Sequence, residues 1–329
     1  MESPTNQYME VINGMEQIME QIMDQRMDDS FKEAVRAAVE ERVGAEVMVT
    51  PVRKNNGLML TGLVIRSSGN NTAPTFYLES IRPEKRTMDR VEILADEIVA
   101  IIQNNQETGG LGNAAEVMNR ILGDTEELKS RVYPRVVNYG WNEELLTALP
   151  HRRFLDLAIT YDIEMATGAS CRVRNEMMEI ISLSEDDLYE AAIRNIRLRS
   201  YQIMTMADML DRAGVEMGVN IRGAEEGMPL VVITNPSGIN GAYGIIDEEL
   251  LEHIYHRFGF GDHRGLDFFS IPSSVHEILV TPAQSGAEGE YLNHIKSMVR
   301  EVNENNVALE ERLSDSVYIY EKHRGVRIA

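Results

Sequence analysis

The chain has 329 residues, of which 43% are hydrophobic and 26% charged, a globular composition far from that of disordered chains. Fifty-three acidic residues oppose 32 basic ones, which gives a formal net charge of −21. This charge disfavours general nucleic-acid binding, because the phosphate backbone repels it. The acidity serves either solubility or the imitation of a nucleic acid toward a basic partner, and charge alone does not separate the two.

Membrane, secretory and disulfide-rich classes are not indicated. No apolar run reaches the roughly 18–20 residues of a membrane-spanning helix, and the N-terminus lacks the basic start and apolar block of a secretory signal. A single cysteine, Cys171, excludes a disulfide framework within the chain and a metal site with several cysteine ligands. We therefore expect a cytoplasmic protein of two domains or lobes, and no motif predicts a cofactor.

A degenerate four-residue repeat runs from Met15 to Met27. Residues four apart are neighbours on a helix, so the repeat predicts a Met-rich helix within an extension over residues 1–29. Methionine is common on adaptable binding surfaces. The helix either binds a partner protein or a second copy of the chain, or packs on its own domain as an extension.

An N-terminal lobe with the order α-β-β-β-α is predicted over residues 30–125. The pair Asn56-Gly57 between two β-rich runs is a strong hairpin signal, because both residues tolerate positive φ. The predicted elements, in chain order, are a helix that contains Phe31 and ends near Gly44, strands at 46–52, 58–65 and 75–78, and a helix over 87–103.

A C-terminal α+β lobe is predicted over residues 126–329. Several adjacent strands are joined by turns too short for a parallel crossover, so we expect largely antiparallel or mixed sheets with packed helices. The spacing from Ser184 to Asp187 predicts a capping box. The strands expected here are 132–138, 154–163, 170–174, 230–234, 242–246, 268–271, 275–281 and 316–320, and the helices follow Asn142, Ser184, Asp247 and Gly289.

Three histidines, His253, His256 and His263, fall close together in the sequence. His253 and His256 share a helix face at i and i+3, and Glu252 or Asp262 could complete a metal site. The pattern is not HExxH, and a loop precedes His263. The alternative is a polar helix end, where histidines are favoured.

Ser274 and His276 lie on one face of the strand predicted at 275–281. A Ser–His pair hydrolyses substrates only when the hydroxyl reaches the imidazole and a third group supports the pair. Asp315 is a further candidate for this chemistry. Neither a GxSxG elbow nor a Ser-x-x-Lys motif occurs at this position. The stretch is either a hydrolytic centre or a turn that leads into a strand.

The loop from Asn235 to Gly241 is the main candidate for ligand binding. It lies between two predicted strands and forms either an anion nest or a plain hairpin loop. The candidate residues are Asn235, Asn240 and Gly241, together with His151 and Arg152 if the side chains converge. Basic residues also cluster at Arg172 and Arg174 and at Arg194, Arg197 and Arg199, and they either pair with internal acids or bind an anionic ligand.

Several stretches in a fixed order resemble a known family. They are Asn55–Gly57, Pro150–Leu157, Thr234-Asn235 with Gly241-Ala242, Ile271–Ile278 and Leu313–Tyr318. This series resembles DUF5688, a family of bacterial proteins known mainly from Firmicutes, over residues 27–320. The resemblance implies a genetic context beside conjugative and other mobile elements, and it carries over no activity and no catalytic residue. Members usually begin near Phe31, so residues 1–26 depart from the pattern.

The sequence as a whole favours a non-enzymatic protein-interaction module of mobile-element or phage context. Its acidity and its Met-rich repeat support this hypothesis. Counter-defence, through binding of a basic host protein, is one specific version. The alternative is a hydrolase or small-ligand-binding protein with a site around Ser274 and His276.

Overall fold

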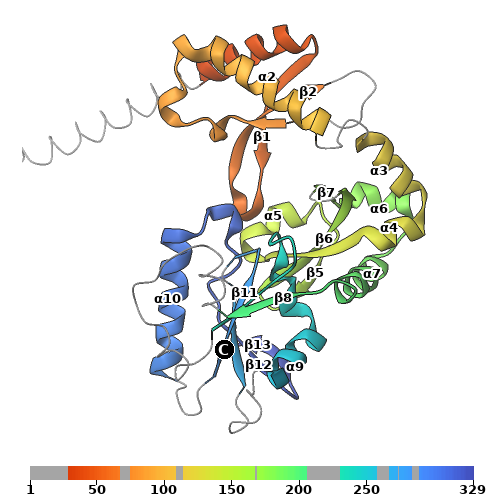
Figure 1. Cartoon of the computed structure of the whole chain (residues 1–329), viewed down its shortest axis with the longest axis vertical. Helices are drawn as coiled ribbons and strands as arrows, with labels where there is room; N and C mark the ends of the chain where they lie inside the picture. The colour runs from red at the N-terminus through yellow and green to blue at the C-terminus, as the bar shows by residue number, and fades with distance from the viewer. Residues whose placement is uncertain are drawn as a thin grey trace, which may run out of the picture. The chain divides into compact units, whose positions relative to one another are not determined.

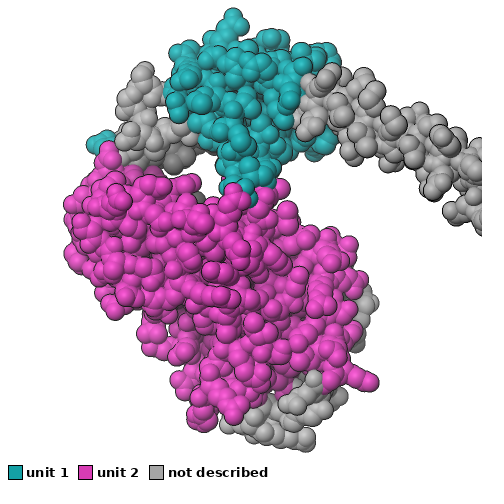
Figure 2. Space-filling view, turned by 180° about the vertical axis from the view of Figure 1, so that it is seen from behind, with its two compact units in different colours: residues 1–53, 59–117 teal, residues 54–58, 118–329 magenta. Residues whose placement is uncertain are grey.

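The computed structural model describes residues 29–66, 75–108, 114–166, 169–205, 230–257, 267–272, 274–283 and 289–329 (Figure 1). The predictions on Met15–Met27, Asp262 and His263 lie outside these residues. None of the described helices combines the length and apolar character that crossing a membrane requires. The chain forms two compact units, residues 1–53 with 59–117 and residues 54–58 with 118–329 (Figure 2).

Unit 1 is a three-stranded antiparallel sheet with two long helices. Side chains of the helix over residues 29–43, such as Phe31 and Val35, share a buried core with Leu63 and Ile98. The elements follow the predicted order, and they are the helix over 29–43, β1 (Glu46–Arg53), β2 (Met59–Arg66), β3 (Thr75–Tyr77), the short 3-10 turns η2 (Leu78–Ser80), η3 (Pro83–Lys85) and η4 (Met88–Arg90), and α2 (Val91–Thr108). Strands β1 and β2 pair from Glu46↔Arg66 to Arg53↔Met59, as the hairpin signal predicts.

The first sheet of unit 2 is also antiparallel. β6 (Leu157–Ala166) pairs with β4 (Val132–Asn138), β5 (Arg152–Phe154) and β7 (Ala169–Arg172). The strand predicted at 154–163 is wrong in one respect: Leu155, at φ 58°, and Asp156 form a tight turn that splits it into β5 and β6. The helices of unit 2 here are α4 (Thr125–Arg131), α5 (Glu143–Leu146), α6 (Asn175–Ile181) and α7 (Glu185–Arg197), and α3 (Ala114–Gly123) begins in the last residues of unit 1. The capping box from Ser184 to Asp187 is confirmed at the start of α7.

The second sheet of unit 2 has the strand order β13-β12-β10-β11-β9-β8, with every neighbouring pair antiparallel. Phe269 on one face packs with Ile295 and Val299 of α10 (Glu290–Asn306), and Phe268 on the other stacks on Tyr320. Tyr320 also meets Tyr255 of α9 (Glu248–Arg257), so α9 and α10 cover opposite faces. The strands are β8 (Gln202–Thr205), β9 (Val231–Thr234), β10 (Phe268–Ile271), β11 (Ile278–Pro282), β12 (Tyr318–Glu321) and β13 (Gly325–Ile328).

Two strand predictions in this part are wrong. Residues 242–246 belong to a fully buried 3-10 helix, η8 (Gly241–Ile246), which follows Asn240 at φ 56°. The strand predicted at 275–281 begins only at Ile278, because the Val275 amide donates to Glu311 O (2.8 Å) rather than to a neighbouring strand. The α+β class with largely antiparallel sheets and packed helices is confirmed.

Candidate functional site

One segment of unit 2, residues 308–318, collects hydrogen bonds from stretches that lie far apart in the sequence. It starts with η9 (Leu309–Glu311) and leads into β12. Asn55 Nδ2 donates to Glu310 O (2.7 Å), Asn138 Nδ2 to Leu313 O (3.1 Å) and Asn303 Nδ2 to Ser314 O (3.0 Å). The segment therefore joins three stretches that are far apart in the sequence, and one of them, Asn55–Gly57, belongs to the family-like series.

An asparagine chain forms one side of this junction. The Asn56 amide donates to Asn142 Oδ1 (2.8 Å), and Asn142 Nδ2 donates back to Asn56 Oδ1 (2.8 Å) and to Asn138 O (2.9 Å). Asn142 was expected to cap a helix, but its side chain makes no capping hydrogen bond to α5. Its side-chain amide instead hydrogen-bonds to Asn56 in η1 (Asn55–Gly57), the turn between β1 and β2.

A single carboxylate, Asp156, holds the other side of the junction. Ser314 Oγ and Ser316 Oγ donate to its Oδ2 (2.8 and 2.9 Å), and the Tyr318 hydroxyl donates to its Oδ1 (2.5 Å). Burial, followed by the hydrogen bond to Asp156, raises the pKa of Tyr318 and keeps its hydroxyl protonated as a donor. No spacing rule reveals this network, because Asp156 and its donors are far apart in the sequence.

The His276 loop cluster brings together five residues predicted from the sequence: Asn235, Asn240, Gly241, Ser274 and His276. The Asn240 amide donates to His276 Nδ1 (3.1 Å), and His276 Nε2 lies 3.4 Å from Glu311 Oε1. A neutral imidazole so placed carries its proton on Nε2. The His276 carbonyl accepts from Thr234 Oγ1 (2.7 Å). Both ring nitrogens therefore help to hold the loops in place.

The Ser274 hydroxyl also serves the loop. Its oxygen accepts the His276 amide (3.0 Å) and donates to Glu277 Oε1 (3.2 Å), and the residue is only 6% exposed. Among the described residues, its hydroxyl makes no hydrogen bond to an imidazole nitrogen. This geometry matches a turn that leads into β11 better than a nucleophile that meets a substrate.

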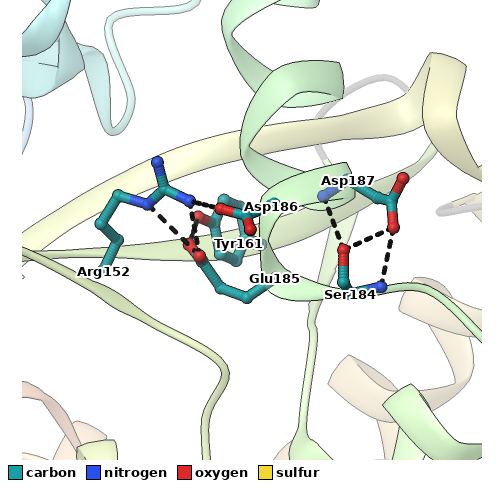
Figure 3. Close-up of polar contacts among 6 residues, drawn as sticks. All are labelled: Arg152, Tyr161, Ser184, Glu185, Asp186 and Asp187. Atoms are coloured by element: carbon teal, nitrogen blue, oxygen red, sulfur yellow. Dashed lines mark hydrogen bonds and ion pairs between the residues drawn. The ribbon is translucent and has the colours of Figure 1, made fainter.

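The other catalytic and ligand-binding candidates lie apart from the cluster. Asp315 Oδ1 accepts from Asn303 Nδ2 (2.8 Å), and His151 Nδ1 lies 2.9 Å from Leu149 O. Arg152 pairs with Glu185 and Asp186 at the start of α7 (Figure 3), and its Nη2 lies 2.8 Å from Glu185 Oε2. Its guanidinium also lies over the ring of Tyr189, 4.1 Å from the centroid. These contacts satisfy Arg152 internally.

The described metal candidates are exposed on α9. His253 and His256 are both exposed, and His256 Nε2 lies 3.8 Å from Glu252 Oε1. Within the part of the chain that the structure describes, no three histidine, cysteine, aspartate or glutamate side chains form a possible metal site.

A groove that the sequence did not reveal lies on unit 2. Two cavities, of about 430 and 320 Å³, share Arg197, Glu248, Arg324 and Gly325. The larger is lined by charged residues of α9 and of the β12–β13 turn, and the smaller has apolar walls. The apolar residues of the smaller cavity are Phe154, Tyr189, Ile193, Ile245, Ile246 and Val326. The groove was missed because β13 carries no clear strand pattern.

Three tyrosines, of which two are buried and Tyr201 is half-buried, predict a sharp loss of stability at alkaline pH. Burial raises the pKa of Tyr161, Tyr201 and Tyr318, each of which also donates to a carboxylate. The unfolded chain releases these protons near pH 10. The folded chain retains them, so the free energy of unfolding is unaffected below about pH 10 and falls as the pH rises above it.

An alkaline titration checks this prediction by following tyrosinate absorbance and circular dichroism together. We expect part of the tyrosinate signal to appear only as the native dichroism disappears. If every tyrosine ionises near pH 10 while the fold persists, the prediction is wrong.

Comparison with known proteins gives one result. The model of DUF5688, a family of unknown function, matches residues 28–322, nearly the whole chain. No curated protein and no solved structure matches the chain significantly.

Proposed function

Because the chain belongs to the DUF5688 family, whose function is unknown, we propose a function from its own residues: a non-enzymatic module that binds an extended segment of a basic protein along β13. The observation that supports this proposal most directly is the groove beside β13, which is an edge strand of its sheet. Extended segments commonly bind by adding a strand to an exposed sheet edge, where the backbone gives affinity and pockets for alternate side chains give specificity.

The backbone of β13 is suited to such pairing. Ala329 N donates to Val317 O (2.8 Å), and hydrogen-bonded pairs alternate along an antiparallel ladder. The backbone groups of Gly325 and Arg327 in β13 therefore face β12. The amides and carbonyls of Val326 and Ile328 then face away from β12. No described strand pairs with β13 on that side.

Side chains beside this edge supply an apolar pocket and a charged rim. Val326 pairs with Tyr320 and lines the smaller cavity opposite Phe154 and Ile193. Alternate side chains of a bound strand point the same way, so one apolar side chain of the partner reaches this cavity. The larger cavity is lined by Glu248, Glu249 and Glu252 and by Arg197, Lys322 and Arg324, so its rim offers charges of both signs. The net charge of −21 of the whole chain attracts a basic partner.

The family-like polar residues support a binding role over a catalytic one. Asn56, Asp156 and His276 use their side chains to hold the 308–318 segment in place. The mobile-element context that the resemblance implies supports a host protein as the partner, and the single Cys171 supports binding in the cytoplasm.

Selection of random displayed peptides on the immobilised full chain tests the proposal. We expect peptides with a basic residue near an apolar one, and binding roughly tenfold weaker to Val326→Pro, which removes one outward amide. Val326→Thr keeps the amide and is expected to keep the affinity, provided that both variants melt like the wild type.

Peptides that bind Val326→Pro as tightly as the wild type would contradict binding along β13. The predicted helix at Met15–Met27 is the competing binding segment. Removal of residues 1–26 is expected to leave peptide affinity unchanged. A loss of binding on that removal would assign the partner to the N-terminal segment instead.

A further inference from the structure

The face of the first sheet of unit 2 carries a cationic cluster formed by Arg135, Asp162, Arg172 and Arg174. Asp162 of β6 lies directly opposite Arg172 of β7, and Tyr133 of β4 is its partner on the other side. Arg135 lies two residues beyond Tyr133, so it shares that face. The register alone therefore places two guanidinium groups around one carboxylate.

Both guanidinium groups share the Asp162 carboxylate. Arg135 Nη1 lies 3.1 Å from Asp162 Oδ2, and Arg172 Nε lies 3.5 Å from Oδ1. The side chain of Asp162 is 10% exposed, and those of Arg135 and Arg172 are 25% and 23% exposed. Asp162 Oδ1 is buried and, among the described residues, accepts no hydrogen bond. One carboxylate thus neutralises two half-buried cations incompletely.

Arg174 adds a third cation without a carboxylate. It is exposed, and its positive charge lies near enough to Arg172 to contribute to the lowered pKa of that guanidinium. Three guanidinium groups against one carboxylate leave two excess positive charges. Among the other basic residues that the sequence singles out, Arg152, Arg197 and Arg199 each have an acidic partner. An unbalanced cationic cluster is unexpected in a chain of net charge −21.

The energetic cost of this cluster falls on Arg172. Burial, and then the neighbouring Arg135, lower the pKa of Arg172. Removing a cation from water is costly unless it is paired, and two adjacent guanidinium groups repel each other. An oxyanion between them would remove both costs, because the guanidinium fork matches phosphate oxygens in pairs.

We infer that Arg135, Arg172 and Arg174 form a binding site for a phosphate-class dianion, free or as the monoester group of a small molecule. A dianion balances the two excess charges. The remaining N–H groups of Arg135 and Arg172 donate to its oxygens, and Arg174 adds an exposed contact. The site is separate from the groove beside β13 and does not depend on peptide binding there.

Isothermal titration of the full chain with inorganic phosphate, at constant ionic strength, tests the site. We expect saturable binding that is at least roughly tenfold weaker in Arg172→Gln and in Arg135→Gln. Arg174→Gln changes an exposed side chain, folds regardless, and is expected to weaken binding severalfold. Arg300→Gln on α10 removes an equal charge elsewhere and is the matched control, for which no change is expected.

Two further titrations distinguish a specific binding site from general electrostatic attraction between phosphate and arginine side chains. Asp162→Asn removes the negative charge beside the ligand and is expected to strengthen phosphate binding. A sugar phosphate that binds more tightly than inorganic phosphate would identify a monoester as the ligand, and equal affinities would identify the free ion. The inference is overturned if phosphate shows no saturable binding, or if Arg174→Gln and Arg300→Gln weaken it equally.

Discussion

Replacing Asp156 by alanine is expected to lower the free energy of unfolding of unit 2 by about 4 kcal/mol. The carboxylate accepts the hydroxyls of Ser314, Ser316 and Tyr318, and its loss leaves these donors without their acceptor in a half-buried site. Hydrogen bonds to a charged group contribute about 1.5–3 kcal/mol each, and three on one carboxylate are not additive. Urea unfolding followed by Trp141 fluorescence measures the change, because this single tryptophan lies in unit 2.

Asp315→Ala is the matched control for this experiment. Asp315 belongs to the same segment, but it is exposed and, among the described residues, accepts a side-chain hydrogen bond from Asn303 Nδ2 alone. We expect its loss to cost less than about 1 kcal/mol. If Asp156→Ala costs no more than Asp315→Ala, the Asp156 carboxylate does not hold the 308–318 segment in place.

Most of the fold could be predicted because its signals are local. Alternating apolar residues and the Asn56-Gly57 pair specify β1 and β2, and Ser184 with Asp187 specifies the start of α7. The errors fall where distant contacts override local preference. Leu155 adopts a positive φ that its side chain does not favour, and Asp156 alone, without a glycine or proline beside it, is a weak turn signal.

The candidate site was predicted only in part, for a related reason. The Asn235–Gly241 loop and the Ser274–His276 turn lie next to β9 and β11, which pair, so an antiparallel sheet brings them together. Arg152 does not join these loops, because it forms an ion pair with Glu185. No sequence-spacing rule connects these two residues. The Asp156 network and the groove beside β13 depend on tertiary neighbours alone. Hydroxyl donors and an edge strand have no sequence pattern strong enough to locate them.

Glycine at position 241 illustrates how a residue predicted to bind a ligand serves the packing of the loops. A Cβ at this position would lie 2.5 Å from His276 O and from Thr234 Oγ1, and 2.7 Å from Asn235 N. Two of these atoms belong to the backbone, so no flexible side chain can move aside. The lack of space, and not a positive φ, excludes every other residue there.

Gly241→Ala is therefore expected to destabilise unit 2 by about 3 kcal/mol. The added methyl group forces the loop away from β11 and breaks the bond from Thr234 Oγ1 to His276 O, and it disturbs the neighbouring bond from the Asn240 amide to His276 Nδ1. Gly123→Ala is the control, since a Cβ added at the end of α3 would meet nothing within 4 Å. Its expected effect is between zero and a gain of about 1 kcal/mol. Urea unfolding monitored by Trp141 compares the two, and the proton shifts of His276 show whether the ring loses its amide donor. Equal stability of the two variants would mean that the loops tolerate a side chain at 241, and the site would then be open enough to admit a ligand.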